Sequence, residues 1–182
     1  MNALQKSFKD IISCSEREDT FSIDLLQKSN FSDCAGFYSK FLHEVELLPV
    51  FKFKSILAIF GDFYLGEDFK SVLSKIGSEF YAIHRAGSGF KILVFEKRML
   101  EDTVYCELHF FNNSLIYASF SFLDNSKSTK SAVRKDVLSK SLNETILLEK
   151  FILCDINSNK MMFTEEDSIE VVFYNENQLI LK

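Results

Sequence analysis

Apolar residues recur at helical spacing in the first third of the chain. Over residues 4–12 they return every three or four positions, which predicts a short amphipathic helix. The same spacing continues over residues 32–48, with Ser32 as the expected N-cap and Pro49 as the stop. Proline ends a helix because it pushes the preceding residue out of the helical region.

A strand and a second helix are expected before residue 78. The strand is predicted by a compact apolar run over residues 55–60. Apolar residues at helical spacing over 69–76 then follow the acids Glu67 and Asp68 and precede Gly77. Acids beside the first turn and a glycine just past the last turn are typical of a capped helix.

From residue 79 onward the apolar residues recur at every second position, which is the period of a strand. This pattern predicts one hairpin from residues 79–85 and 90–97, and another from residues 104–110 and 116–122. Turns rich in glycine or asparagine separate the strands of both pairs. We therefore expect an antiparallel meander with one face on the core.

The last third mixes loop, helix and strand. Residues 124–131 predict a loop, residues 133–142 a short helix, and residues 145–155 a central strand covered on both faces. Alternation over residues 169–173 and a final run over residues 178–181 predict two more strands.

Helices followed by a mainly antiparallel, meander-like β-sheet with one late helix define an α+β fold. The 182 residues fit one domain, so we expect a single α+β domain over residues 1–182. Its helical part spans about residues 1–77 and its sheet part about residues 79–182. The chain has 20 Phe and no Trp, which predicts a large aromatic core.

The charge of the chain narrows the choice of partners. A formal net charge of −5 disfavours nucleic acid and anionic membrane, because both require clustered basic residues. The most apolar stretch, residues 47–65, contains Lys52, Lys54 and Asp62, so no membrane span is predicted. A basic protein partner fits this charge.

The cysteines and the N-terminus indicate a reducing compartment. Cys14, Cys34, Cys106 and Cys154 are widely spaced, with no CxxC pair and no metal-ligand spacing. Lys6, among the first residues, interrupts any secretory signal. We expect a cytoplasmic protein with no metal and no cofactor.

Two glycine-containing motifs are interpreted as structural. The loop over residues 61–68 has the glycine spacing of a phosphate-binding loop, but Glu67 and Asp68 stand where Lys and Ser or Thr are required. Their negative charge would repel a phosphate at the helix N-terminus. Residues 86–90 lack the spacing of a nucleophile elbow and lie between two predicted strands.

The histidines leave an enzyme open as an alternative. Cys106 and His109 are three apart in a predicted strand, so they point to opposite faces and cannot pair directly. Nucleophile–base pairs are assembled by the fold, so a site built from dispersed residues such as His84, His109 and nearby acids stays open. His43 lies on the edge of a predicted helix. A ligand cavity lined by phenylalanines also stays open.

Acidic clusters and neighbouring aromatic residues form the candidate interface. Aromatic anchors surrounded by charge are typical of protein-binding surfaces, and we expect this set to be exposed. Its members are Glu101, Asp102, Tyr105, Glu107, Glu165, Glu166, Asp167, Glu170 and Tyr174. No catalytic residue is predicted.

In general profile, a small acidic chain with no catalytic motif, the sequence resembles immunity proteins of bacterial contact-dependent and polymorphic toxin systems. The resemblance implies a non-enzymatic cytoplasmic protein that binds and neutralises a cognate toxin domain. No shared motif accompanies it, so no residue role is transferred. The alternative of a type III-like secretion chaperone fits less well, because the pattern predicts strands at the end of the chain where such chaperones carry a helix.

Overall fold

The computed structural model describes residues 34–53, 55–59, 63–76, 80–84, 89–99, 102–122, 127–139, 146, 148–165 and 168–180. The helices in these ranges are α3 (Cys34–Val45), α4 (Phe69–Ile76), α5 (Lys127–Ser139) and α6 (Glu176–Leu179). The strands are β1 (Val50–Lys52), β2 (Phe80–His84), β3 (Phe90–Met99), β4 (Asp102–Phe111), β5 (Ser114–Phe122), β6 (Lys150–Cys154), β7 (Lys160–Thr164) and β8 (Ile169–Tyr174). Within these ranges, no helix has the length and apolar character needed to cross a membrane.

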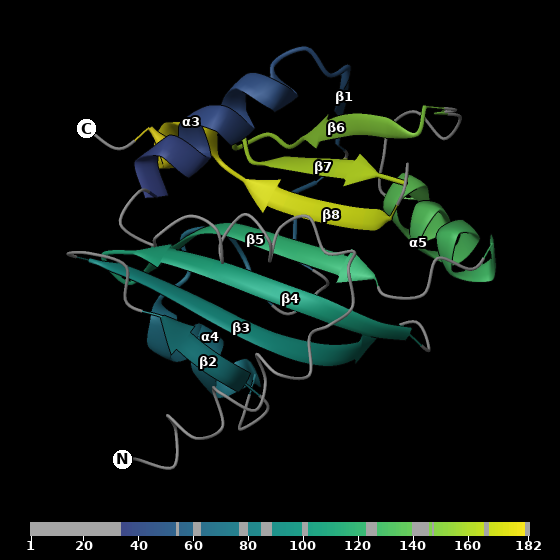
Figure 1. The fold of residues 1–182 in the computed structure, drawn as a ribbon. Helices are drawn as coiled ribbons and strands as arrows, with labels where there is room; N and C mark the ends of the chain where they lie inside the picture. The colour runs from purple at the N-terminus through teal and green to yellow at the C-terminus, as the bar shows by residue number, and fades with distance from the viewer. Residues whose placement is uncertain are drawn as a thin grey trace.

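The strands form one sheet in the order β1-β6-β7-β8-β5-β4-β3-β2 (Figure 1). It consists of two antiparallel meanders, β2 to β5 and β6 to β8, which join where β5 pairs antiparallel with β8. Only β1 departs from this rule, since it pairs parallel with β6 at the edge of the sheet. The predicted α+β class with a mainly antiparallel sheet is confirmed.

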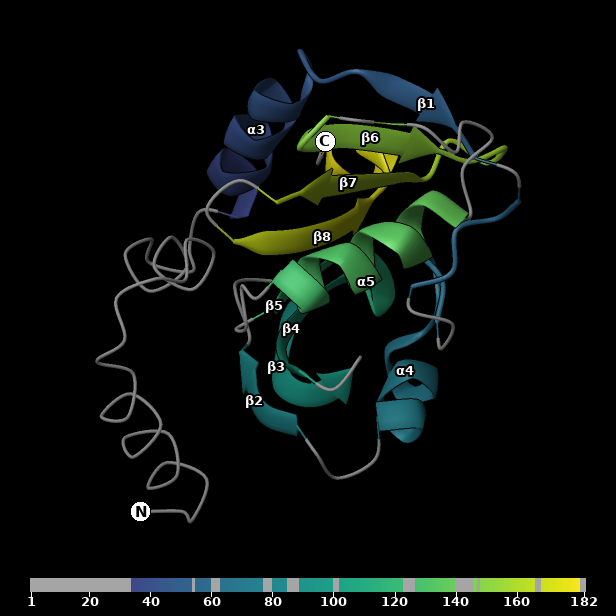
Figure 2. The ribbon, with the colours of Figure 1, turned by 90° about the vertical axis from the view of Figure 1, so that its right-hand side faces the viewer.

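Helices cover both faces of the sheet. Figure 2 shows the sheet curving around α5 and α4, and α3 packs against the opposite face. The larger core lies on the concave side and includes Val72 of α4 and Val133 of α5. The smaller core lies under α3, where Tyr38 and Phe41 pack against β5 and β8.

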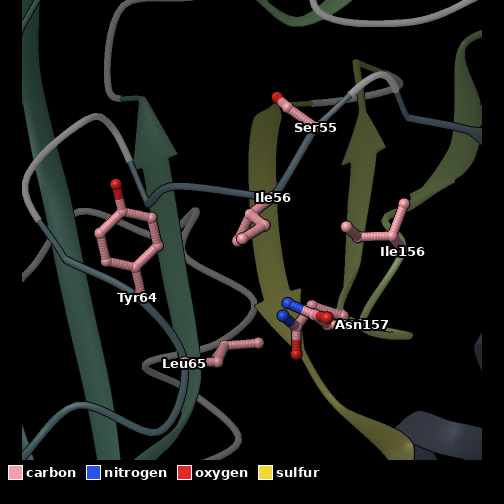
Figure 3. Close-up of a pocket in the computed structure, with 7 residues that line it drawn as sticks. Ser55, Ile56, Tyr64, Leu65, Ile156 and Asn157 are labelled. Carbon is pink, nitrogen blue, oxygen red and sulfur yellow. The ribbon is translucent and has the colours of Figure 1, made fainter.

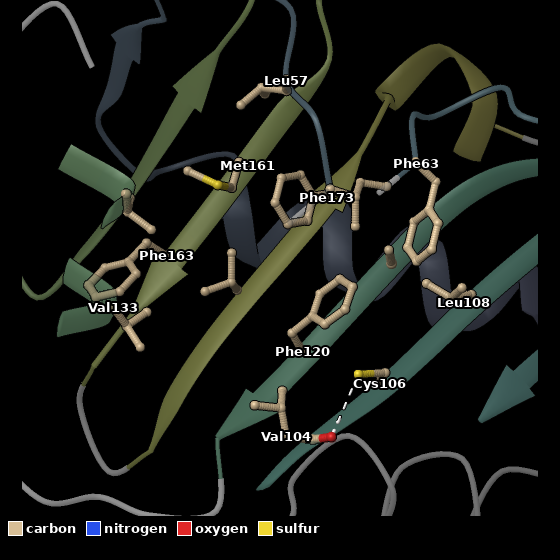
Figure 4. Close-up of a cluster of buried hydrophobic side chains, with 14 of the residues drawn as sticks. Leu57, Phe63, Val104, Cys106, Leu108, Phe120, Val133, Met161, Phe163 and Phe173 are labelled. Carbon is tan, nitrogen blue, oxygen red and sulfur yellow. Dashed lines mark hydrogen bonds between the residues drawn. The ribbon is translucent and has the colours of Figure 1, made fainter. Parts of the chain in front are cut away.

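Residues that alternate along a strand point to opposite faces of the sheet and so contribute to different cores. Along β4, Val104, Cys106, Leu108 and Phe110 all face the larger core. Figure 4 shows the same arrangement across the sheet, where aromatic side chains of β5, β7 and β8 point to one side. The intervening residues point to the opposite face, where Glu107 and His109 lie under α3, so this face of the strand carries polar side chains.

Several elements were predicted at their observed places. Helix α4 has the predicted bounds, and α3 lies inside the predicted helix over residues 32–48. Strands β2 to β5 and β8 occupy the predicted segments, with shifts at their ends. The predicted helix over residues 4–12 lies outside the described residues.

The predicted strand over residues 55–60 is wrong in place. The strand before α4 is β1, Val50–Lys52, and among the described residues 55–59 the pairing is limited to an isolated bridge between Ile59 and Phe63. Leu57 and Ile59 are buried in the larger core although they belong to no strand. An apolar run therefore indicated burial here and not strand pairing.

The other corrections fall in the last third of the chain. Helix α5 begins at Lys127, inside the predicted loop over residues 124–131. Strand β6 is covered as predicted, but it lies next to the edge strand β1 and not at the centre. Strand β7 was not predicted.

The predicted last strand over residues 178–181 is also wrong, because residues 176–179 form the single turn α6. Asn175 caps this turn, since its side chain accepts a hydrogen bond from the Asn177 N–H. Strands after β8 therefore do not distinguish this chain from a secretion chaperone.

Candidate functional site

The expected exposure of the candidate interface is wrong for several of its members. Tyr174 is 0% exposed and meets Phe41 of α3 edge-to-face, with 4.9 Å between ring centroids. Asp102 and Glu107 are buried as well. For Tyr174 the cause is α3, which covers the end of the sheet where this residue lies.

The remaining members divide between half-buried and undescribed residues. Tyr105, Glu165 and Glu170 are half-buried, and the Glu165 carboxylate pairs with the guanidinium of Arg134 on α5. Three further members, Glu101, Glu166 and Asp167, lie outside the described residues. The structure therefore does not gather the predicted set into one exposed patch among the residues it describes.

A hydrogen-bonded chain instead forms under α3. Tyr38 Oη of α3 lies 2.7 Å from Nδ1 of His109 on β4, and Nε2 of the same ring contacts the Glu107 carboxylate. Glu107 and His109 are two apart in a strand, so they share a face. That spacing is the signal in the sequence that could have found the pair. Tyr38 offered no such signal, because its contact with the strand depends on the packing of α3.

One tautomer of His109 satisfies every group in these contacts. A neutral His109 that donates from Nε2 to the Glu107 carboxylate accepts from the Tyr38 hydroxyl at Nδ1, and all three side chains are then satisfied. This order of groups resembles a nucleophile, a base and an orienting acid. However, Tyr38 is 0% and His109 1% exposed, so a substrate has no access to them with α3 in place. The chain of contacts therefore holds α3 on the sheet.

A second acid, the half-buried Glu170, lies on the same face of the sheet. The Ser119 hydroxyl of β5 donates to Glu170 of β8 over 2.9 Å, and Ser119 is also the register partner of Glu107 on β4. Burial raises the pKa of Glu170, and the negative charge of Glu107 raises it further. Polar side chains of three adjacent strands thus meet on the α3 face.

Cys106 and His43 lie apart from this chain of contacts. Cys106 faces the larger core, opposite to His109 as predicted, and burial raises the pKa of its thiol to about 12. His43 is exposed on α3, 3.8 Å from the exposed Glu46 carboxylate. The His84 side chain lies outside the described part of the molecule, as does all of Cys14. Within the described ranges, no group of three or more His, Cys, Asp or Glu is placed to hold a metal ion.

The acids before α4 serve the helix itself. Glu67 accepts hydrogen bonds from the Ser71 hydroxyl and the Tyr64 N–H, and it pairs with Lys75. Burial alone would raise the pKa of Glu67, but these partners together hold it below its usual value. Asp68 Oδ1 accepts from the Lys70 N–H at 2.8 Å, as an N-cap does.

Exposed apolar side chains gather along one edge of the sheet. Leu47 and Val50 lie before and within β1, and Ile56 follows it; they are 89%, 51% and 47% exposed. Leu148 and Ile156 flank β6, the neighbour of β1, and are 45% and 76% exposed. We call these five residues the β1 edge surface. Large exposed hydrophobic residues outside it are Tyr64 and Ile180 among the described residues.

The β1 edge surface ends in a groove of about 670 Å³. Figure 3 shows Ile56 between Tyr64 on one side and Ile156 on the other, with Asn157 below. The lining residues are Ser55, Ile56, Tyr64, Leu65, Ile156, Asn157 and Asn159. The groove is open and its lining is mainly apolar, with polar side chains from Ser55, Asn157 and Asn159.

Asp155 holds both walls of this groove. Its Oδ2 accepts from the Leu57 N–H at 2.9 Å, which fixes the segment that carries Ile56. Its Oδ1 accepts from the N–H groups of Asn157 and Asn159, each at 2.8 Å, which fixes the turn that carries Ile156. One buried carboxylate therefore sets the spacing of two segments far apart in the sequence.

Comparisons with known proteins add little to this geometry. No protein-family model matches the chain, and no curated protein matches it. Among solved structures, a cysteine-rich secretory protein from Staphylococcus aureus is similar over 71% of this chain, at 14% identity and a TM-score of 0.33. The chain covers 51% of that protein, about half its length. A likeness of this degree carries no argument about function.

Proposed function

We propose that this chain is a non-enzymatic protein-binding module, an immunity protein that binds and neutralises a cognate toxin domain in the cytoplasm. The observation that carries the proposal is the β1 edge surface. Five exposed large apolar side chains line one edge and lead into a groove. Exposed large apolar side chains near one another are typical of sites for protein partners.

The charge at one end of this surface favours a basic partner, and Lys52 is the exposed basic residue of β1 itself. Glu46 and Glu149 are exposed beside Leu47 and Leu148, at the end of the edge where β1 begins. The whole chain carries a formal net charge of −5. Opposite charges at the rim speed encounter and select the partner, while the apolar centre supplies most of the affinity.

This surface differs from the interface that the sequence suggested. Glu107 and Tyr174 are buried by α3 and by neighbouring strands, so they cannot contact a partner in this conformation. Ile56 and Ile156 are exposed in their place. The proposal therefore keeps the protein-binding role and moves the contact residues to the β1 edge surface.

Co-expression with the product of the adjacent upstream gene tests the proposal. We expect a one-to-one complex that weakens as salt is raised from about 0.1 M to 1 M, since the screening length falls from about 10 Å to 3 Å. Ile156→Asp should abolish the complex. Ile180→Asp is the matched control, because Ile180 is 60% exposed but lies outside the groove and the β1 edge surface. A protein recovered alone and monomeric, or equal loss in both variants, would overturn the proposal.

A further inference from the structure

We infer that the partner binds by strand addition: an extended segment of the partner protein pairs with the free edge of β1 and places an apolar side chain in the groove. This inference rests on the proposed function and specifies how the partner is recognised. It is carried by the main-chain hydrogen bonds of β1, by the exposure along its edge and by the position of the groove.

The hydrogen bonds to β6 show which main-chain groups of β1 are left to pair with another strand. The Ile152 N–H donates to the Pro49 carbonyl at 2.9 Å, and the Phe53 N–H donates to the Cys154 carbonyl at 2.9 Å. Main-chain groups of consecutive residues point alternately to the two sides of a strand. The N–H and C=O groups of Val50 and Lys52 therefore face away from the sheet.

The outer side of β1 has no strand beside it in the described part of the chain, because β1 is the end member of the sheet. Val50 is 51% exposed, and Lys52 is exposed as well. A row of outward N–H and C=O groups is a ready template for another strand. Recognition of an extended segment through such an edge draws affinity from main-chain hydrogen bonds and specificity from side-chain pockets.

The groove supplies the pocket that this mode of binding requires. Ser55 and Ile56 follow β1 along the chain, and Ile156 follows β6, the parallel partner of β1, so the groove lies at the end of the sheet where β1 and β6 end. The inferred anchor is a side chain at the end of the added segment that reaches this groove. A short edge strand bearing a lysine does not by itself recruit strands indiscriminately. The apolar side chain that enters the groove thus makes the addition selective.

The surroundings of the edge define the chemistry of the occupant. At the beginning of β1, the exposed Glu46 and Glu149 favour a basic residue on the partner segment. At the other end, Ile56, Tyr64 and Ile156 favour an aliphatic or aromatic side chain. We therefore assign the edge to a segment of a separate basic protein that carries one apolar anchor and a basic residue several positions away.

Lys52→Pro tests this assignment because it removes the outward N–H and leaves the pairing with β6 intact. Proline is tolerated on edge strands where the missing N–H would face solvent. Lys52→Ala is the matched control, since it removes the same side chain and keeps the N–H. With the co-expressed upstream gene product, we expect Lys52→Pro to weaken binding about tenfold or more and Lys52→Ala by less than about threefold.

A second measurement separates strand addition from side-chain contact. In the wild-type complex, amide hydrogen exchange at Val50 and Lys52 should slow relative to the free protein, while the exposed amides of the described loops keep their rates. Urea unfolding of Lys52→Pro confirms that the variant is folded. If the wild-type protein forms a complex and Lys52→Pro binds equally well, strand addition is wrong and the proposed function stands.

Two other outcomes also overturn the inference. If the wild-type protein forms no complex, the proposed function and the inference fail together. If the free protein is a dimer by light scattering and Lys52→Pro makes it monomeric, the edge is occupied by a second copy of this chain and not by a partner.

Discussion

The Tyr38 hydroxyl lies 2.7 Å from Nδ1 of His109, 71 positions further along the chain. Glu107 completes the contact on the other side of the ring. All three residues are buried, so each lost partner leaves a polar group without water to replace it. The chain of contacts thus fixes the position of α3 on β4 more specifically than the apolar packing around it.

Removing one oxygen atom tests this role. Tyr38→Phe should lower the free energy of unfolding by about 1–3 kcal/mol, because Nδ1 of His109 is left buried without a donor. Urea unfolding monitored by circular dichroism measures the difference. Tyr64→Phe is the matched control, since Tyr64 is 48% exposed and its hydroxyl can be replaced by water. Equal stability of Tyr38→Phe and wild type would show that the contact does not hold α3.

The sequence predicted those elements whose hydrophobic pattern matches the side chains that are buried in the structure. Helix α4 has acids at one end, glycine at the other and one apolar face, and all three signals agree on its bounds. Strands β3 to β5 are nine or ten residues long, and the alternation of apolar and polar residues along β4 is long enough to define a period. Short elements gave no such signal, because β1 has three residues and α6 four. Pairing and capping, and not local pattern, decide their conformation.

The candidate site was less predictable for a related reason. The β1 edge surface exists because β1 and β6 lie at the end of the sheet, and strand order is a property of the whole fold. Tyr174 and Phe173 point to opposite faces of β8, as neighbouring strand residues do. The sequence could not show that α3 covers the face on which Tyr174 lies. The acidic clusters were visible as charge, but their exposure depends on partners such as Arg134, which is distant in sequence.

Glu170 makes the stability of the fold dependent on pH. Burial raises its pKa, the nearby Glu107 carboxylate adds to the rise, and the Ser119 hydroxyl and Lys150 oppose it. A raised pKa in the folded state means that the stability contributed by Glu170 is complete below its ordinary value and is lost as the pH rises through the folded value. Ionised Glu170 therefore destabilises the protein at neutral pH.

Glu170→Gln should relieve this cost, since glutamine stays neutral and its carbonyl can still accept from the Ser119 hydroxyl. We expect the variant to be more stable than wild type at pH 7.5 and similar to wild type below about pH 4, where the glutamic acid is protonated. Glu149→Gln, at an exposed position, should show no such pH-dependent gain. A Glu170→Gln effect that is the same at both pH values would contradict a raised pKa.

The buried thiol of Cys106 should be chemically inert in the native protein. Burial raises its pKa from 9.0 to about 12, so the reactive thiolate is scarce at pH 8. Cys154 is only half-buried and serves as the internal comparison. In a Cys14→Ser, Cys34→Ser background, iodoacetamide at pH 8 should label Cys154 first, with Cys106 labelled only in urea. Peptide mass spectrometry distinguishes the two, and prompt native labelling of Cys106 would contradict its placement in the core.

The carboxylate of Asp155 should be irreplaceable at the base of the groove. Each of its oxygens accepts main-chain hydrogen bonds, one from Leu57 and the other from Asn157 and Asn159. Asp155→Asn turns one acceptor into a donor that faces a donor, which should cost about 1–3 kcal/mol of unfolding free energy. Asn157→Ala is the control, because it keeps the Asn157 N–H and removes only an exposed side chain.

Amide hydrogen exchange locates the effect of Asp155→Asn. We expect faster exchange at the N–H groups of Leu57, Asn157 and Asn159, which all donate to this carboxylate, and unchanged exchange in β4. Because these amides hold the walls that carry Ile56 and Ile156, the variant should also bind the upstream gene product more weakly than wild type. Normal binding together with faster exchange at the three amides would show that the groove is not part of the interface, and the contact would then be confined to the β1 strand itself.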